Sequence, residues 1–518
     1  MNLAVRGPES RTRRLIYSFP GAIFALYALL LGVVSLRHEM FRDEVQAWLI
    51  ARDSTSIPNL FFNMRYEGHP ALWQLLLYIP SHLSWNPEWM QLINYLLAVC
   101  EAWLILSESR MSRATRVLLV FSFFVFYGYG VVARDYMLAM LMLTAAARCL
   151  LGEKRRPSLA ILFLALAINS HFFAIPIAVL IFVILYCFAE PDSFKAPALL
   201  FRKMSFWIPS AALLASLIAA YFTLRPRSDS YTPHYGLNHL SNFDYFLMSL
   251  GRSWQMFVPI PEAFMPQRLR EALVPRSAPS LLSVTLALAI LLVIAFGLRT
   301  ARARWFFLLS ALFEYAVFAV TVRIPPVRHY GLIICALIIA LMMDAIGAKG
   351  QHERRISGLR SSALFALLAL QVFGSVTASA VDLVRPFSEA KETALWMRST
   401  GLNRNPIVIT PDLVTSSVVG YMERDKVYYP ECQCFGSFVL WNRTRNPDRM
   451  LTVGELEVLA RTSPLPPIVI ENSLLDEAST TRLRLHLLRA FDRHPMYANE
   501  CFYVYEYADL VLARTTHP

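Results

Sequence analysis

The sequence predicts a membrane protein with an all-α polytopic domain of about eleven transmembrane helices and a small C-terminal α/β domain. Two observations favour this fold class. Of the 518 residues, 56% are hydrophobic and only 17% are charged, whereas soluble domains carry roughly 25% charged residues. Apolar runs of near-spanning length also recur along the chain. A net charge of +12 would suggest nucleic-acid binding in a soluble protein. Here the positive residues gather in short loops between apolar runs, so we expect no nucleic-acid partner.

The apolar runs are long enough to cross a bilayer, the shorter ones with ends that neighbouring helices shield. They cover residues 15–36, 90–106, 117–132, 136–151, 159–171, 172–189, 206–224, 281–298, 305–322, 330–346 and 362–380. The first run follows four arginines and has no small-residue cleavage site after it, so we interpret it as a retained helix and not as a signal peptide.

The basic residues lie in alternate loops and so predict the orientation of the chain. Outer turns carry few cations, whereas every predicted inner loop is basic, which places the N-terminus in the cytoplasm and the C-terminal domain outside the membrane. The inner loops contain Arg110, Arg113 and Arg116; Lys154, Arg155 and Arg156; Lys195, Arg202 and Lys203; Arg299, Arg302 and Arg304; and Lys349, Arg354, Arg355 and Arg360.

Three outer segments are long: residues 38–88, 226–280 and the tail from 382. We therefore expect a membrane domain over residues 1–381, which includes the first two of these segments, and an extracytoplasmic domain over residues 382–518. Within the tail, strand-like runs at 407–410, 467–471 and 502–507 alternate with helical patterns at 453–461 and 479–490.

Three cysteines lie in the predicted outer domain: Cys432, Cys434 and Cys501. An oxidising compartment favours one disulfide, from Cys501 to either Cys432 or Cys434. The spacing of the first two without nearby histidines is weak evidence for a metal.

The first outer loop carries the acidic pair Asp43 and Glu44 directly after the first apolar run. One interpretation is a helix cap, since acidic residues are common in the first turn of a helix. The other is a general base or a metal ligand. Glu67 and His69 follow in the same loop, just before Pro70. They either mark the start of an interfacial helix or add a carboxylate and an imidazole to the acidic pair, as acid/base or metal chemistry requires.

Three separate outer turns present polar side chains at one membrane depth. Arg134 and Tyr136 lie in the first turn, His171 in the second, and Arg328, His329 and Tyr330 in the third. Arginines at this depth extend to lipid headgroups or bind a phosphate in bidentate fashion. A single histidine is more often structural, so the convergence of the three turns is the stronger argument for a site.

These strings resemble the GT-C membrane glycosyltransferases, specifically bacterial members related to protein O-mannosyltransferases and to the lipid A aminoarabinose and Rgt-type transferases. The similarity runs in order over roughly residues 15–350. It rests on DE at 43–44, HPAL at 69–72, RDY at 134–136, SHFF at 170–173 and RHY at 328–330. The chain departs from the common pattern at Ala71, where many relatives have proline, at Asp135, and at His329, where many have RY directly.

The resemblance implies a GT-C fold in a bacterial cytoplasmic membrane. It also implies transfer of a sugar, with inversion, from a polyprenyl-phosphate donor to a glycan, lipid or protein acceptor on the outer side. Asp43 matches the position of the family's base, with Glu44 beside it as a second catalytic candidate. The cations that would stabilise the leaving phosphate are Arg134 and Arg328. The other substrate-binding candidates are Glu67, His69, Tyr136, His171 and Tyr330; whether some of the acidic residues hold a divalent cation stays open.

Three other functions remain as alternatives. A polytopic transporter predicts ionisable groups near the membrane midplane and an internal repeat, and no repeat is visible. An O-antigen ligase or polymerase predicts a large outer loop late in the chain, whereas the acidic motif here lies in the first one. A non-catalytic scaffold is disfavoured by the intact Asp43 and Glu44.

Overall fold

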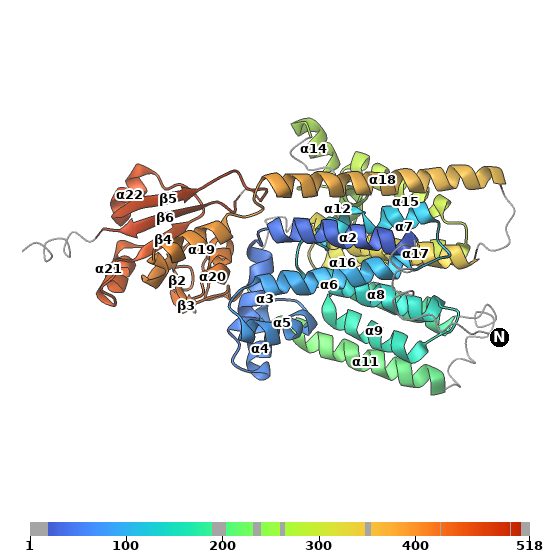
Figure 1. The fold of residues 1–518 in the computed structure, drawn as a ribbon, viewed down its shortest axis with the longest axis horizontal. Coiled ribbons are helices and arrows are strands. Elements are labelled where there is room, and N and C mark those ends of the chain that lie inside the picture. Colours follow the sequence, from blue (N-terminus) through green and yellow to red (C-terminus); the bar gives the residue numbers. More distant parts are fainter. Residues whose placement is uncertain are drawn as a thin grey trace, which may run out of the picture. The chain divides into compact units, whose positions relative to one another are not determined.

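The computed structural model (Figure 1) describes residues 19–188, 204–231, 240–259, 265–347, 354–424, 426–497 and 499–508. The chain divides into two compact units. We call residues 1–33, 94–222 and 234–379 the helical unit, and residues 34–93, 223–233 and 380–518 the mixed unit. The contacts thus group the first outer loop with the tail, whereas the sequence analysis assigned that loop to the membrane domain.

Each of the eleven apolar runs coincides with helical structure in the described residues. The corresponding helices are α2 (Phe19–Arg37), α6 (Glu88–Leu106), α7 (Arg113–Val120), α8 (Asp135–Leu151), α9 (Pro157–Ser170), α10 (Ala174–Leu180), α11 (Met204–Leu224), α15 (Leu281–Gly297), α16 (Ala301–Val320), α17 (Gly331–Gly347) and α18 (Arg354–Val384). The second long outer segment adds α12 (Asn242–Arg252), α13 (Trp254–Phe257) and α14 (Gln267–Leu273). Residues 15–18 of the first run, residue 189 of the sixth and the basic residues Lys195, Arg202, Lys203 and Lys349 lie outside the described residues.

Six helical segments of the described chain are long and apolar enough to cross a membrane, so the chain is a multi-pass membrane protein. They are Phe19–Arg37, Glu88–Leu106, Met204–Leu224, Ala301–Val320, Val327–Gly347 and Ser362–Val384. Shorter apolar helices accompany them, and α8, α9 and α11 lie side by side (Figure 1), with the Asn169 amide of α9 donating to Ser216 Oγ of α11 at 2.7 Å.

The predicted single helix over residues 117–132 is wrong, because the chain breaks after α7. Ser122 adopts an extended conformation (ψ 155°), and residues Phe123–Gly128 (η2) then form a π-helical turn. Side chains from other helices bind the carbonyls that the break releases. Tyr27 Oη donates to Val125 O at 3.0 Å, and Asn94 Nδ2 donates to the carbonyls of Tyr129 and Gly130 at 2.8 and 2.9 Å. Irregular backbone at membrane depth is tolerated where such partners exist.

A second π-helical segment, Ile181–Cys187 (η3), continues α10 without a break. π-helical turns within helices occur frequently at functional sites. Both segments lie in the helical unit, which also contains the three outer turns singled out by the sequence.

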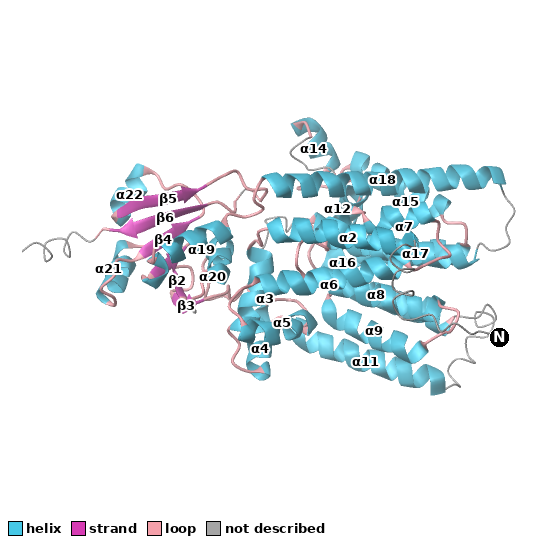
Figure 2. Cartoon of the chain, viewed as in Figure 1, coloured by secondary structure: helices cyan, strands magenta, loops and turns pink. Residues whose placement is uncertain are grey.

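The mixed unit combines helices with a six-stranded sheet, and Figure 2 shows the strands in magenta. The first outer loop folds into α3 (Arg42–Arg52), α4 (Ile57–Asn63), η1 (Met64–Tyr66) and α5 (Leu72–Leu83). The tail adds α19 (Ala390–Ser399), α20 (Asp412–Tyr421), α21 (Val453–Arg461) and α22 (Glu477–Leu483). Helix α3 packs on α5 and α20, closely enough that a Cβ at Gly420 would lie 2.3 Å from Val45 Cγ1.

The sheet has the strand order β3-β2-β1-β4-β6-β5. Strand β1 pairs in parallel with β2 and β4, and the remaining pairs are antiparallel. Its strands are β1 (Ile407–Ile409), β2 (Val427–Tyr429), β3 (Cys434–Gly436), β4 (Ile468–Glu471), β5 (Leu485–Phe491) and β6 (Phe502–Tyr507). Buried residues of α21 and of β1, β4, β5 and β6 form the core on one side of the sheet.

The helical pattern predicted over residues 479–490 is wrong in its second half. Helix α22 ends at Leu483, where Arg484 takes a left-handed conformation (φ 56°). The next seven residues form β5, because they pair with β6 along its length.

The predicted disulfide partner is also wrong. Cys432, which lies between β2 and β3, bonds to Cys434, the first residue of β3, while the Cys501 thiol donates to the carbonyl of Asn472. Cys501 precedes β6, and two strands separate β6 from β2. At about 4.8 Å per strand this is far more than the 4.4–6.8 Å that a disulfide spans between Cα atoms.

Candidate functional site

The acidic pair of the first outer loop occupies the first turn of α3, and its two carboxylates have different surroundings. The Glu44 side chain is fully buried, and its Oε2 accepts the backbone N–H of Phe41 at 3.2 Å, a capping interaction. The Asp43 side chain is 24% exposed, with Arg42 Nε 3.9 Å from its Oδ1. The cap interpretation therefore describes Glu44, whereas Asp43 is the more exposed of the two carboxylates.

A buried histidine holds this turn in place. His38 Nε2 lies 3.1 Å from Glu44 Oε2, and His38 Nδ1 lies 2.8 Å from Asp382 Oδ2, with all three side chains fully buried. Burial alone lowers the pKa of His38, but the charges and hydrogen bonds of Glu44 and Asp382 outweigh it and raise that pKa to about 10. At neutral pH a protonated His38 thus donates to both carboxylates.

This network joins three separate parts of the chain. His38 follows α2 directly, Glu44 lies in the first turn of α3, and Asp382 lies in the last turn of α18. The carbonyl of His38 also accepts the Gln91 amide at 2.9 Å. Sequence reasoning missed His38 and Asp382, because a histidine beside a helix end shows no partner until the chain is folded. A divalent cation beside Glu44 would be repelled by the protonated imidazole.

Glu67 forms a hydrogen bond with Gln46 of α3. Gln46 lies three residues after Asp43, and therefore on the same side of the helix. Gln46 Nε2 donates to Glu67 Oε1 at 2.9 Å and to the carbonyl of Val439 at 2.8 Å, while its Oε1 accepts the Val439 N–H at 3.0 Å. Gln46 was not among the predicted residues, although its spacing from Asp43 is the signal that could have found it.

Glu67 faces a cavity of about 340 Å³ within the mixed unit, lined also by the aromatic side chains of Tyr66, Tyr231 and Trp441. Glu67 is followed by Gly68, whose φ of +66° favours glycine because it has no Cβ. This turn leads to the half-buried His69. A carboxylate beside aromatic rings suits a polyhydroxylated ligand. The carboxylate accepts hydrogen bonds from the hydroxyls of the ligand, and the rings pack on the apolar faces of the ligand.

In the helical unit, the three turns that the sequence predicts to lie outside meet in a cluster of Tyr136, His171 and His329. Tyr136 Oη lies 3.0 Å from His329 Nδ1, and its ring centroid lies 4.3 Å from that of His171. The two imidazole centroids are 6.2 Å apart. The Phe173 N–H donates to His171 Nδ1 at 3.1 Å, which places the proton of a neutral His171 on Nε2. The structure thus brings together one residue from each turn.

Cations accompany this cluster. Arg134 lies just before α8, with its guanidinium carbon 5.5 Å from the centroid of the Tyr136 ring. Arg328 lies in the 3-10 turn Val327–Tyr330 (η7), and its carbonyl accepts the hydroxyl of Tyr129 at 2.6 Å. Tyr129 stacks in turn on Tyr136, with centroids 4.8 Å apart and rings inclined by 7°.

Tyr330 has a different environment from the rest of its turn. Its side chain is fully buried, and its hydroxyl donates to the carbonyl of Ser249 at 3.0 Å. We therefore interpret Tyr330 as an anchor for the turn, while His329, which the sequence analysis treated as a departure, takes part in the cluster. Gly331 is required next, since a Cβ there would lie 2.3 Å from Tyr129 Oη.

Similarity to known proteins is detected in structure and not in sequence. No protein-family model and no curated protein sequence matches the chain. ArnT from Cupriavidus metallidurans in the apo state superposes with a TM-score of 0.51 at 11% identity, covering 94% of this chain and 97% of that one. ArnT from the same organism bound to undecaprenyl phosphate gives a TM-score of 0.51 at 12% identity, with 95% and 98% covered. The mycobacterial arabinofuranosyltransferase AftD gives a TM-score of 0.30 at 11% identity, with 94% and 41% covered.

The likeness to ArnT extends over nearly the whole of both chains. The chain therefore has the fold of ArnT, which confirms the fold that the ordered sequence strings implied.

Proposed function

We propose that the chain is an inverting glycosyltransferase that moves a sugar from a polyprenyl-phosphate donor to an acceptor hydroxyl on the outer side of the cytoplasmic membrane. The observation that carries this proposal is Asp43, a partly exposed carboxylate on a turn fixed by buried charges, in a chain with the GT-C fold. The donor class is supported by ArnT, which was crystallised with undecaprenyl phosphate.

Asp43 acts as the general base in this mechanism. It takes the proton of the acceptor hydroxyl while the oxygen attacks C1 of the sugar. The bond between C1 and the phosphate oxygen breaks, and polyprenyl phosphate leaves with the electron pair. Arg134 and Arg328 stabilise the charge that develops on that phosphate.

The other candidate residues support these steps. Glu44 and His38 are positioning residues, since they fix the first turn of α3 and so the direction of Asp43. Glu67 and His69 bind the acceptor, and Tyr136, His171 and His329 orient the donor phosphate beside Arg134.

The proposed topology follows from the same function. The N-terminus lies in the cytoplasm, and α3, α4, α5 and the tail lie outside, where lipid-linked sugars meet envelope acceptors. The basic inner loops of the sequence support this orientation.

Donor turnover by the purified chain in bilayers tests the proposal. With a polyprenyl-phosphate sugar and envelope acceptor, we expect Asp43→Asn to lower the rate by about 10²–10⁴, the range for loss of a general base. Asp448→Asn is the matched control, because this aspartate is exposed on the loop before α21. An Asp43→Asn rate within about threefold of wild type would exclude Asp43 as the base.

A polytopic transporter is the second candidate, and two observations favour it. The chain breaks between α7 and η2, and the carboxylates of Glu101 and Glu314 are fully buried in the helical unit. Broken helices and intramembrane carboxylates are features of transport pathways. Solute flux into vesicles that persists in Asp43→Asn, without consumption of any lipid-linked sugar, would favour transport.

A further inference from the structure

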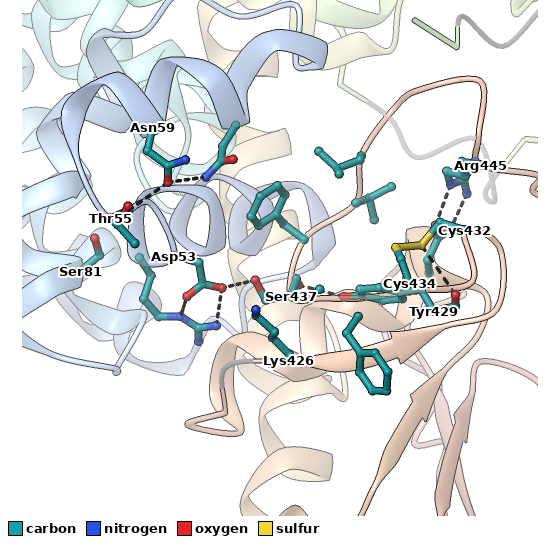
Figure 3. Close-up of a pocket in the computed structure, with 18 of the residues that line it drawn as sticks. Asp53, Thr55, Asn59, Ser81, Lys426, Tyr429, Cys432, Cys434, Ser437 and Arg445 are labelled. Carbon is teal, nitrogen blue, oxygen red and sulfur yellow. Dashed lines mark hydrogen bonds and ion pairs between the residues drawn. A yellow bond between two sulfur atoms is a disulfide. The ribbon is translucent and has the colours of Figure 1, made fainter. Parts of the chain in front are cut away.

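A larger cavity of about 830 Å³ lies in the mixed unit (Figure 3). It lies at the C-terminal end of α3, whereas Asp43 lies in the first turn of that helix. One wall comes from the end of α3 and from α4 and α5, with Asp53, Thr55 and Asn59 among its residues. The other wall comes from Lys426, which directly precedes β2, and from β2, β3 and the chain after them, including Ser437.

The first wall is held by an internal ion pair. Arg52 donates to both oxygens of Asp53, at 2.7 and 3.0 Å, and Ser437 Oγ donates to Asp53 from the opposite wall. The Arg52 guanidinium also lies 4.7 Å from the centroid of the Trp85 ring. These contacts place the Trp85 ring, 42% exposed, at the border of the cavity.

The second wall is held in the same way. Arg445 makes a bidentate ion pair with Asp412, and its guanidinium packs 5.0 Å from the centroid of Trp441. The disulfide between Cys432 and Cys434 closes the chain between β2 and β3. Both aspartates in the lining are therefore neutralised by arginines, and the walls are set before any ligand arrives.

The groups left for a ligand are hydroxyls, amides, aromatic faces and one cation. The side-chain oxygen Oδ1 of Asn59 accepts the Thr55 N–H at 3.0 Å and the Asn63 amide at 3.3 Å, while Asn59 Nδ2 makes no hydrogen bond within the described residues. Phe435, 59% exposed, adds a second aromatic face. Lys426 has an exposed ammonium group and no acidic partner in the described part of the chain.

We propose that this cavity is a distal acceptor subsite that binds an oligosaccharide segment carrying an anionic substituent. Aromatic faces beside hydrogen-bonding amides and hydroxyls suit the mixed apolar and polar surface of sugar rings. Lys426 supplies the positive charge for a carboxylate or phosphate on that segment. The charged pairs and amides among the lining residues disfavour a lipid chain, which cannot hydrogen-bond to them.

The geometry of α3 explains why such a subsite would lie away from the base. The ten residues from Asp43 to Asp53 span about 15 Å along the helix. Gln46 connects the two ends, since it binds Glu67 and also Val439, which lines the cavity. An acceptor of several sugars, with its reactive hydroxyl at Asp43, would extend along α3 to this cavity. The inference rests on the proposed function, which it deepens by assigning the acceptor class.

Binding is tested without donor by equilibrium dialysis of the full-length chain in nanodiscs. The probe is the oligosaccharide fraction released by mild acid from the envelope of a deletion strain, in which unmodified acceptor accumulates. We expect the wild-type chain to retain acidic oligosaccharides. We expect Lys426→Gln and Trp85→Ala to lower their retention on the order of tenfold, Lys426→Arg to keep most of it, and the exposed control Lys154→Gln to keep all of it. Retention that is equal in wild type and both cavity variants, or no retention of acidic sugars by wild type, overturns the inference.

Steady-state kinetics of sugar transfer distinguish a failure of this inference from a failure of the proposed function. In Lys426→Gln, the KM for the oligosaccharide acceptor should rise on the order of tenfold, while the KM for the donor and the slow hydrolysis of donor by water stay at wild-type values. An acceptor KM within twofold of wild type contradicts the subsite even when donor is consumed. Absence of any donor consumption by wild type contradicts the proposed function instead, whatever the dialysis shows.

Discussion

Replacement of His38 by glutamine is the sharpest structural perturbation that the mixed unit offers. The imidazole lies between two buried carboxylates, 3.1 Å from Glu44 and 2.8 Å from Asp382. Glutamine retains polar atoms of similar reach but removes the positive charge. His38→Gln therefore leaves two buried acidic groups without their cation.

The expected loss of stability follows from two independent considerations. Removing one partner from a buried ion pair typically costs about 3–5 kcal/mol. The rise of the His38 pKa from 6.5 to about 10 corresponds to about 5 kcal/mol, at about 1.4 kcal/mol for each tenfold change in proton affinity. We therefore expect His38→Gln to lower the free energy of unfolding by about 3–5 kcal/mol.

The same network predicts how stability depends on pH. The folded-state pKa of His38 lies above its unfolded value, so its contribution is complete below pH 6.5 and is lost as the pH rises toward 10. Denaturant titrations of the full-length chain at pH 6.5 and pH 10 measure this contribution. The wild-type chain should lose stability between these two values, and His38→Gln should lose correspondingly less.

A double-mutant cycle with Asp382→Asn provides the control. Removing one carboxylate should recover part of the stability that His38→Gln loses, because one fewer charge is buried without a partner. Activity offers a second readout: His38→Gln should lower kcat for donor turnover with little change in donor KM, since His38 positions the turn that carries Asp43. A loss below about 1 kcal/mol together with zero coupling would refute the proposed network.

Three further predictions concern single side chains. Arg134→Ala should raise the KM for the polyprenyl-phosphate donor while Arg134→Lys keeps part of the affinity; an unchanged donor KM would remove Arg134 from the site. Gln46→Glu should lower the free energy of unfolding by about 1–3 kcal/mol, because its carboxylate faces Glu67, and adding Glu67→Gln should restore part of the loss in a chemical denaturation experiment. A membrane-impermeant maleimide should label Cys501 from the outer side and label Cys432 and Cys434 only after reduction; labelling of Cys501 only from the cytoplasm would reverse the proposed orientation.

The helices could be predicted from the sequence because a bilayer imposes a minimum length of apolar residues on every spanning segment. The break at Ser122 could not, since it depends on Tyr27 and Asn94, which bind the released carbonyls from other helices. Strand β5 was missed for a similar reason. Its residues Leu485–Phe491 fit a helical pattern locally and form a strand because β6 pairs with them.

In the site, too, some contacts could be predicted from the local sequence, whereas others depend on residues far away in the chain. The meeting of Tyr136, His171 and His329 could be expected, because the sequence predicts that their turns lie at one membrane depth. The different surroundings of Asp43 and Glu44 could not, since the burial of Glu44 depends on a network in which His38 contacts Asp382, 344 residues further along the chain.

Direct measurement of donor cleavage tests the central claim most directly. The purified chain is reconstituted with a polyprenyl-phosphate sugar and envelope acceptor, and the products are followed by mass spectrometry and by the anomeric configuration of the new bond. The proposed function predicts release of polyprenyl phosphate and appearance of the sugar on the acceptor with inverted configuration, both lost in Asp43→Asn. A folded wild-type chain that consumes no donor, or Asp43→Asn that forms the same product at the wild-type rate, would contradict it.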